Sequence, residues 1–475
     1  MRTAILLTMV WLGAGSGAQA QRNLPPQVRQ YVSIDAPVVA LTHVNLIDGT
    51  GRPARTDQTI VITGEKISAV GPASSTPAPA GAQIVDLGGR TVIPGLIGLH
   101  DHMYYSSPAG GSMKPMLSSY PRLFLGAGVT TIRTTGSVDS YQELNLRRWI
   151  LDGIVAGPEI VVTGPYLQGP GPGPGAMHPL SGPDDAARMV TYWAEEGVTW
   201  FKAYTQVTQA ELKAAIDAAH THGVKVTAHL CSIGFREAVA LGIDNLEHGL
   251  LTNSEYFPGK AVDTCPADYA AMTRTWAGLD IGSPPVQTTL REMAQRKVAM
   301  TSTLAVMELS SPSRVPRDQR VLDALFPDAA KSVDTYYAGG ATAKDSIDTA
   351  ALKKAMAFER AFVAAGGLLG AGSDPCCLSA IAGYADQRNF ELLVEAGFKP
   401  EEAIKIMTAN GAAILGMADR LGTVEAGKQA DLVVLDGDPS REPAAIKRVT
   451  TVFRRGIGYD SAKLIGSNKG QVGLR

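Results

Sequence analysis

Two histidines, two positions apart, close an apolar run in the first quarter of the chain. The run extends from Thr91 to His102 and ends in His-Asp-His. Because side chains alternate along an extended strand, the imidazoles of His100 and His102 face the same side of the backbone. Two imidazoles at the end of a buried strand can hold a divalent metal ion. The alternative, a pair of surface or core histidines, stays open for any isolated motif of this kind.

Further polar residues close short, mostly apolar segments downstream. They are Lys202, His229, His248 and Asp374. Helical patterns separate several of these segments, and we expect helices at 183–196, 209–222, 352–365 and 400–409. Apolar strands that alternate with helices predict a parallel sheet, and eight such units would close a barrel. In that fold the catalytic groups come from the C-terminal ends of different strands.

This set of residues, in this order, resembles the amidohydrolase superfamily, specifically its binuclear-metal branch. The resemblance extends to Gly126–Thr131, to Glu247-His248-Gly249 and to Gly427–Val434. Within the superfamily the chain is similar to the imidazolonepropionase-like group, which includes Xaa-Pro dipeptidases, related carboxypeptidases and ochratoxin-type amide hydrolases. True imidazolonepropionases bind one metal and lack the lysine that stands here as Lys202. That departure argues against their reaction.

The resemblance implies an α/β fold with a (β/α)8 TIM-type barrel and two divalent metal ions. The implied ligands are His100, His102 and Asp374 for the first ion, His229 and His248 for the second, and a carbon dioxide-derived carbamate on Lys202 as the bridge. Imidazole mixed with carboxylate-type oxygen indicates zinc. Burial lowers the pKa of a lysine, and the free amine can then capture carbon dioxide. The alternative is a lysine paired with a carboxylate.

The implied chemistry is attack by a metal-bridging hydroxide on a carbonyl carbon. Asp374 is expected to accept the hydroxide proton and to deliver it to the leaving nitrogen. Two further candidate catalytic residues lie at the expected mouth of the barrel. His178 follows a Gly-Pro stretch at 169–175 and could contact the scissile carbonyl or a substrate carboxylate. Tyr204, two positions beyond Lys202, also points toward the mouth.

A second His-x-His motif, His220 to His222, calls for a different interpretation. It precedes Gly223 and the strand that leads to His229. We expect it at a helix C-terminus on the opposite face of the barrel, where imidazolium suits the helix dipole. Arg133 could anchor an anion, but a structural ion pair is the favoured interpretation.

The leading functional hypothesis is a metal-dependent hydrolase of amide or peptide C–N bonds in small substrates, such as dipeptides or N-acyl amino acids. Ester, lactone or phosphotriester hydrolysis is an alternative, because the same hydroxide can attack those centres. A non-catalytic scaffold on a degenerate barrel is an alternative of another class, and absence of bound metal would favour it. The net charge of -2 gives no indication of nucleic acid or an anionic membrane as partner.

Residues 1–20 have the pattern of a secretory signal. Arg2 supplies the positive start, Ala4 to Leu12 the apolar run, and Ala18-Gln19-Ala20 a small-residue cleavage site. The run is too short for a stable membrane anchor. We therefore expect an exported protein, periplasmic or secreted, that begins near Gln21. A buried N-terminal helix is the alternative.

Export makes disulfide bonds possible among the four cysteines. We expect Cys265 to pair with Cys376 or Cys377, with free buried thiols as the alternative. Cys231 follows His229 closely and is expected near the site.

Two flanking regions carry short β patterns and are expected to form one small domain. As in the family, residues 37–90 and 417–475 would pair into a β-sandwich, which leaves 91–416 for the barrel. The Gly-Pro stretch and residues 252–285 and 304–350 are predicted to be irregular. We expect them to be mouth loops that shape the pocket or a contact in a homo-oligomer.

Overall fold

The computed structural model describes residues 23–106, 113–171, 177–344 and 346–473. The expected leader, residues 1–20, and part of the Gly-Pro stretch lie outside the described residues. In the part of the chain that the structure describes, no helix is long and apolar enough to cross a membrane.

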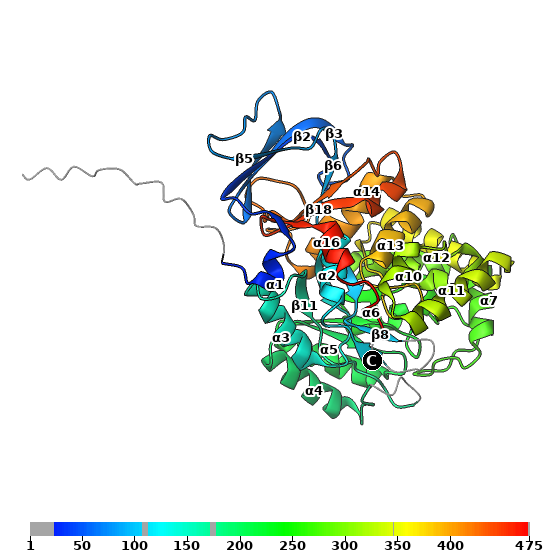
Figure 1. Cartoon of the computed structure of the whole chain (residues 1–475). Coiled ribbons are helices and arrows are strands. Elements are labelled where there is room, and N and C mark those ends of the chain that lie inside the picture. The colour runs from blue at the N-terminus through cyan, green and yellow to red at the C-terminus, as the bar shows by residue number, and fades with distance from the viewer. Residues whose placement is uncertain (1–22, 107–112, 172–176, 345, 474–475) are drawn as a thin grey trace, which may run out of the picture.

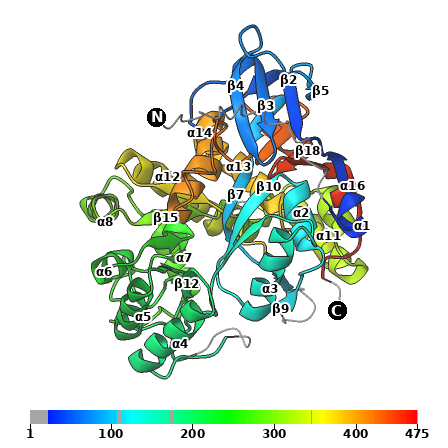
Figure 2. The ribbon, with the colours of Figure 1, turned by 90° about the vertical axis from the view of Figure 1, so that its left-hand side faces the viewer.

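Short parallel strands form the centre of the larger part of the molecule (Figures 1 and 2). Their bounds are β7 (Leu96–Asp101), β10 (Val129–Thr134), β11 (Glu159–Val162), β12 (Trp200–Ala203), β13 (Lys225–Ala228), β14 (Asn245–Glu247), β15 (Ala299–Ser302) and β16 (Leu369–Ala371). They lie in two sheets, with the orders β11-β10-β7 and β12-β13-β14-β15-β16. Every residue of β7, β12 and β15 is buried, as expected for parallel strands covered on both faces.

Backbone hydrogen bonds connect the two parallel sheets at both of their edges. Just past β11, the Gly164 amide donates to the carbonyl of Trp200 at 2.9 Å. Just past β16, the Asp374 amide donates to the carbonyl of His100 at 2.7 Å. The mixed α/β fold expected from the alternation of apolar segments and helices is confirmed, and the strand ends that carry polar residues all lie on one side.

Helices follow most of these strands and pack around them (Figure 2). Their bounds are α2 (Tyr120–Gly126), α3 (Ser140–Leu151), α4 (Pro183–Glu195), α5 (Gln209–Thr221), α6 (Phe235–Leu241), α8 (Pro284–Gln295), α12 (Ile347–Ala364), α13 (Tyr384–Glu395), α14 (Pro400–Lys405) and α15 (Gly411–Leu415). The predicted helices at 183–196 and 209–222 are α4 and α5. The helix expected at 352–365 is α12, which begins earlier, and the one at 400–409 is α14 continued by a π-helical turn.

A third, largely antiparallel sheet combines strands from both flanks of the chain and lies above the parallel strands in Figures 1 and 2. Its strands are β1 (Val32–Ile34), β2 (Val38–Leu46), β3 (Arg55–Thr63), β4 (Lys66–Pro72), β5 (Gln83–Asp86), β6 (Thr91–Pro94), β17 (Leu432–Leu435), β18 (Val449–Arg454) and β19 (Ile457–Asp460). β17 joins the strands of the two flanks, because it pairs with β18 on one side and with β6 on the other. Leu41, Ile60, Leu432 and Phe453 share one core beneath this sheet.

The run from Thr91 to His102 is not one strand, contrary to the sequence interpretation. It breaks between Pro94 and Gly95 into β6, which belongs to the flank sheet, and β7. Proline has no amide hydrogen to continue a ladder. A Cβ on Gly95 would lie 2.0 Å from the Thr130 hydroxyl oxygen, so the close approach at this crossing requires glycine.

The regions 252–285 and 304–350 contain helices, so the prediction that they are irregular is wrong. The helices are α7 (Tyr269–Gly278), α9 (Leu304–Met307), α10 (Gln319–Ala324) and α11 (Pro327–Thr342). In α11 the buried face holds Ala329, Val333 and Tyr337 at helical spacing. Small and polar residues surround these positions, so the helical pattern of apolar residues is weak in the sequence. Elements outside these three sheets and their helices include α1 (Pro26–Arg29), α16 (Ser461–Gly466) and the hairpin of β8 (Tyr104–Ser106) and β9 (Met113–Pro115).

A disulfide joins Cys231 to Cys265, with Cα atoms 4.9 Å apart, so the predicted pairing of Cys265 with Cys376 or Cys377 is wrong. The sheet order explains the difference. Cys231 follows β13 and Cys265 lies on the segment after β14, the direct neighbour of β13. β16, which precedes Cys376, lies two strands further along the sheet.

Candidate metal centre

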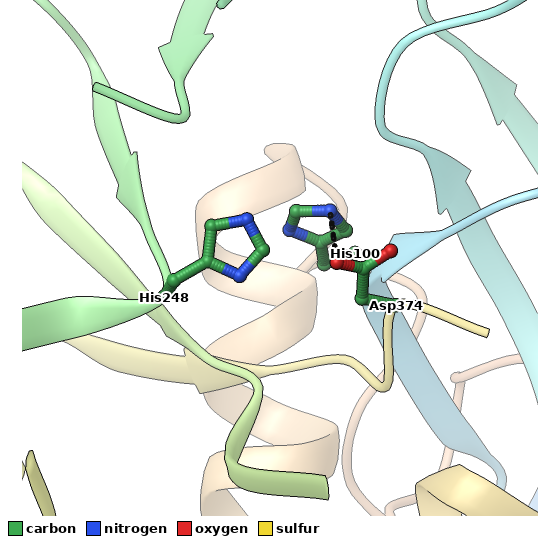
Figure 3. A group of neighbouring side chains, drawn as sticks. All are labelled: His100, His248 and Asp374. Atoms are coloured by element: carbon green, nitrogen blue, oxygen red, sulfur yellow. Dashed lines mark ion pairs between the residues drawn. The ribbon is translucent and has the colours of Figure 1, made fainter. Parts of the chain in front are cut away.

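The side chains predicted as metal ligands meet beyond the C-terminal ends of the parallel strands. His100, His248 and Asp374 offer ligand atoms that all lie within 4.8 Å of one another. Figure 3 shows the three side chains, with an ion pair between His100 and Asp374. His102 completes this side of the cluster, because its Nε2 lies 3.1 Å from Asp374 Oδ1.

Lys202 and His229 close the other side of the cluster. The Nζ of Lys202 lies 3.5 Å from His100 Nε2. The ring centroids of His229 and His248 are 4.4 Å apart, as are those of His100 and His248. The fold therefore brings all six predicted ligands together from strands that are far apart in the sequence.

Partners behind two of the imidazoles fix their orientation. His100 Nδ1 lies 2.8 Å from Glu247 Oε2, and His248 Nδ1 lies 2.7 Å from the Thr303 hydroxyl. Both contacts use Nδ1 and leave Nε2 turned toward the cluster. His248 Nε2 is buried and has no hydrogen-bond partner within the described structure. A metal ion would satisfy that atom. The contact of Nδ1 with Thr303 fits this role, because a histidine that binds a metal through one ring nitrogen commonly has a hydrogen-bond partner at the other.

Glu247 is a functional residue that sequence reasoning left without a role. Arg133 contacts Glu247 Oε1 at 2.5 Å, and Asn245 Nδ2 donates to the same oxygen at 2.9 Å. Burial opposes ionisation of Glu247, but the charges of Arg133 and Lys202 outweigh burial and hold its pKa below the usual value. Arg133 therefore makes the structural ion pair that was favoured. The signal available in the sequence was an acidic residue directly before His248.

The electrostatics of the cluster favour metal-binding protonation states. Burial lowers the pKa of His229 to about 3 and places those of His100 and His248 well below the usual value. These imidazoles are therefore neutral near pH 7, as ligands must be. Burial also lowers the pKa of Lys202 to about 8, so more of this lysine carries a free amine near neutral pH than an exposed lysine would. For Asp374 burial is outweighed by His100, His102 and Lys202, which hold its pKa below the ordinary value.

Two of the predicted ligands have left-handed backbone conformations. His248 has φ 64° and Asp374 has φ 49°, a region that residues other than glycine rarely occupy. Hydrogen bonds from both amides, to the carbonyls of Thr301 and His100 respectively, hold these conformations. Such strain costs on the order of 1–3 kcal/mol and concentrates at functional sites. The observed outliers thus point to the same residues as the side-chain geometry.

Tyrosines form the wall next to the imidazoles. Tyr104 stacks on His102 with centroids 4.6 Å apart, and its hydroxyl lies 2.9 Å from that of Tyr166. The ring of Tyr204 lies 4.9 Å from that of His229, as its position beyond Lys202 suggested. Burial raises the pKa of each tyrosine, so the phenols stay protonated near neutral pH. Tyr104 and Tyr166 were missed, although Tyr104 lies two residues beyond His102.

The structure does not bring His178 to the cluster. Its side chain is 71% exposed, and Nε2 lies 3.9 Å from Asp185 Oδ2. Residues 172–176, which precede it, lie outside the described chain. A catalytic role of His178 therefore stays a prediction without a supporting contact.

Comparison with known proteins gives consistent matches. The amidohydrolase family model matches residues 91–458. The chain is 23% identical over 449 residues to the imidazolonepropionase of Micrococcus luteus. The matched region covers 86% of this chain and 93% of that protein. A presumed prolidase from Bifidobacterium longum superposes with a TM-score of 0.66 at 26% identity, over 91% of this chain and 98% of that one. A Xaa-Pro dipeptidase with bound methionine shares the fold, with a TM-score of 0.66 at 21% identity over 89% of this chain and 100% of that one.

Proposed function

Because the chain belongs to the amidohydrolase family, we propose that this hydrolytic enzyme uses two divalent metal ions to cleave amide or peptide C–N bonds. We propose dipeptides or N-acyl amino acids as substrates. The observation that carries the proposal is the cluster of six nitrogen and oxygen donors, which includes the buried, unpartnered Nε2 of His248. The names of the similar prolidase and dipeptidase structures support this substrate class.

The donor set fits two ions better than one. A structural zinc ion takes four ligands, whereas six donors converge here. His100, His102 and Asp374 would hold one ion, and His229 and His248 the other. Lys202 would supply two bridging oxygens as a carbamate, for which its lowered pKa provides the free amine. Imidazole combined with carboxylate-type oxygen suits zinc.

The residues around the ions have separate tasks in the proposed reaction. When bound, two divalent ions lower the pKa of a water molecule and polarise the scissile carbonyl. Asp374 accepts the proton of the attacking water and passes it to the leaving nitrogen, which departs as an amine. Tyr204 remains protonated and donates a hydrogen bond to the carbonyl oxygen. Glu247 and Thr303 keep two imidazoles in the orientation that leaves Nε2 free.

A matched substrate screen tests this proposal. Protein reconstituted with zinc and bicarbonate is assayed on Xaa-Pro and Xaa-Arg dipeptides, on N-acyl amino acids and on the corresponding esters. We expect amide hydrolysis that disappears on chelation and returns with metal. Hydrolysis of the esters alone would replace the proposal by the ester alternative. A protein with full metal content and no turnover on any substrate would support a scaffold instead.

We further infer that the parallel strands form a (β/α)8 barrel over residues 96–416, with a small β-sandwich from the two flanks, 37–94 and 417–475. The hydrogen bonds at both sheet edges support closure. β6 belongs to the flank sheet, which moves the barrel start to Leu96. We also propose that residues 1–20 are removed on export. N-terminal sequencing of the protein from its native compartment would show a start near Gln21, and a start at Met1 would contradict export by this leader.

A further inference from the structure

Two adjacent cysteines follow Asp374 and have no role in the proposed hydrolysis. Cys376 and Cys377 carry free thiols that are partly exposed, with Sγ atoms 2.7 Å apart. All four cysteines of the chain lie in the described part, and the other two form the Cys231–Cys265 disulfide. The chain therefore carries one paired and one unpaired set of cysteines on the same side of the parallel strands.

The two pairs differ in how well they accommodate a disulfide. Neighbouring Cα atoms across a trans peptide lie about 3.8 Å apart, below the range of about 4.4–6.8 Å that disulfides prefer. A bond between Cys376 and Cys377 would therefore be strained, and strained disulfides are the more easily reduced ones. The Cα atoms of Cys231 and Cys265 are 4.9 Å apart, inside the preferred range. The second pair is suited to a structural bond and the first to a reversible one.

We propose that Cys376 and Cys377 are a modification site that exchanges with small-molecule disulfides and cycles between a dithiol and a vicinal disulfide. One thiol loses its proton to solvent, and its thiolate attacks a sulfur of oxidised glutathione. That attack breaks the glutathione disulfide, releases one glutathione thiolate and leaves a mixed disulfide. The neighbouring thiolate then attacks the protein sulfur of the mixed disulfide and releases the second glutathione. The protein loses two protons and two electrons, and the oxidant gains them.

Backbone contacts connect this pair to the candidate metal centre. The Cys376 amide donates to the carbonyl of Asp374 at 2.7 Å, and the Ser106 amide donates to the carbonyl of Cys376 at 2.6 Å. The carboxylate of Asp374 lies 3.1 Å from His102 Nε2. Ring closure between adjacent cysteines distorts the peptide that joins them, and these contacts pass the distortion to Asp374. Oxidation is therefore expected to lower turnover, a consequence that rests on the proposed function, whereas the covalent step does not.

The covalent step is tested on the zinc-loaded, full-length protein. Samples are equilibrated at mildly alkaline pH, where thiol–disulfide exchange is faster, in glutathione buffers of increasing oxidised fraction. The samples are then acid-quenched, alkylated and mapped by peptide mass spectrometry. We expect the peptide with Cys376 and Cys377 to lose two hydrogen atoms reversibly, while Cys231–Cys265 stays oxidised throughout. Two alkylated thiols at every ratio, or glutathione adducts that never resolve, would overturn the proposal.

The link to turnover is tested with the double variant Cys376→Ser/Cys377→Ser as matched control. Wild-type turnover should fall about tenfold or more on oxidation and recover with dithiothreitol, since misplacement by about 1 Å can cost on the order of 10²-fold. The control should be insensitive to oxidised glutathione. An equal loss in the control would place the effect elsewhere, and unchanged wild-type turnover in the oxidised state would overturn the coupling. If the control does not fold, the wild-type peptide map still decides the covalent step.

Discussion

The chain contains the motif His-x-His twice, once buried at the end of a strand and once exposed at the end of a helix. His100 and His102 stand at the end of β7, almost fully buried, with Asp374 and Glu247 as neighbours. His220 and His222 stand at the C-terminal end of α5 and are exposed. His220 Nε2 lies 3.0 Å from Asp244 Oδ2, where both side chains reach solvent.

Backbone conformation explains the difference. On a strand, residues two apart point the same way, so both imidazoles of the first motif can serve one site. On a helix they point to different sides, because neighbours on a face are three or four apart. His-x-His is therefore a metal-binding motif only when its segment is extended. Such a motif can take part in catalysis when it stands at the C-terminal end of its strand, because the active site of this fold lies on that face.

The sharpest test of this comparison removes one imidazole from each motif. His102→Ala should abolish turnover and lower zinc content, because the first ion loses one of its ligands and Asp374 loses its 3.1 Å contact. The matched His222→Ala should keep both turnover and zinc, with stability within about 0.5 kcal/mol, as is usual for surface positions. Elemental analysis, amide hydrolysis and thermal unfolding measure the three quantities. Loss of zinc in the His222 variant would end the distinction.

Lys202 provides the next largest effect. Lys202→Ala should lose both its bound metal and its turnover, because alanine supplies no bridging oxygens. Short carboxylic acids such as acetate or propionate should fill the space and restore part of the activity. Lys202→Arg should not substitute, since guanidinium stays protonated and cannot form a carbamate.

The control for Lys202 is a lysine that serves as a cation. Lys225 donates to the carbonyl of Ile414 at 3.0 Å, so Lys225→Arg should keep metal and turnover. If Lys202 also served only as a cation, its arginine variant would be tolerated and added carboxylate would change nothing. Full activity with two bound metals in Lys202→Arg would contradict the carbamate.

Asp374→Asn should lower turnover by about 10²–10⁴-fold, the usual contribution of general acid–base catalysis. The amide keeps the shape of the side chain but cannot accept the proton. Single-turnover rates on an amide substrate, with zinc content measured on the same samples, separate lost proton transfer from lost metal. A variant with near-full turnover would show that another group moves the proton.

The sequence allowed prediction of the ligands but not of the groups that hold them. His100, Lys202 and Asp374 each stand near or shortly beyond the C-terminal end of a parallel strand, and these strand ends meet at one place. Glu247 could not be assigned a role, because its contacts to Arg133 and His100 join residues more than one hundred positions apart. The cysteine pairing failed for the same reason, since it depends on strand order in space.

The fold was predictable where the hydrophobic period is strong and not where short strands change sheets. β6 and β7 read as one continuous apolar run, and the break appears only because β17 pairs with β6 from the far end of the chain. His178 shows the corresponding limit for loops. Its place beside a Gly-Pro stretch gave an expected location near the mouth but no partner.

The smallest expected effect compares the carboxylates behind the two motifs. Glu247→Gln removes the charge next to His100 Nδ1, and loss of such a partner typically lowers metal affinity about 10–100-fold. It also leaves Arg133 buried without its counter-charge, which costs on the order of 3–5 kcal/mol.

The double variant Arg133→Met/Glu247→Gln removes that charge and should regain stability without regaining zinc affinity. Asp244→Asn, behind His220, should leave zinc affinity unchanged. Chelator competition measures the affinity below the unfolding temperature of each variant. If the double variant regained both stability and affinity, Glu247 would act only as the partner of Arg133, and the orientation of His100 would have another cause.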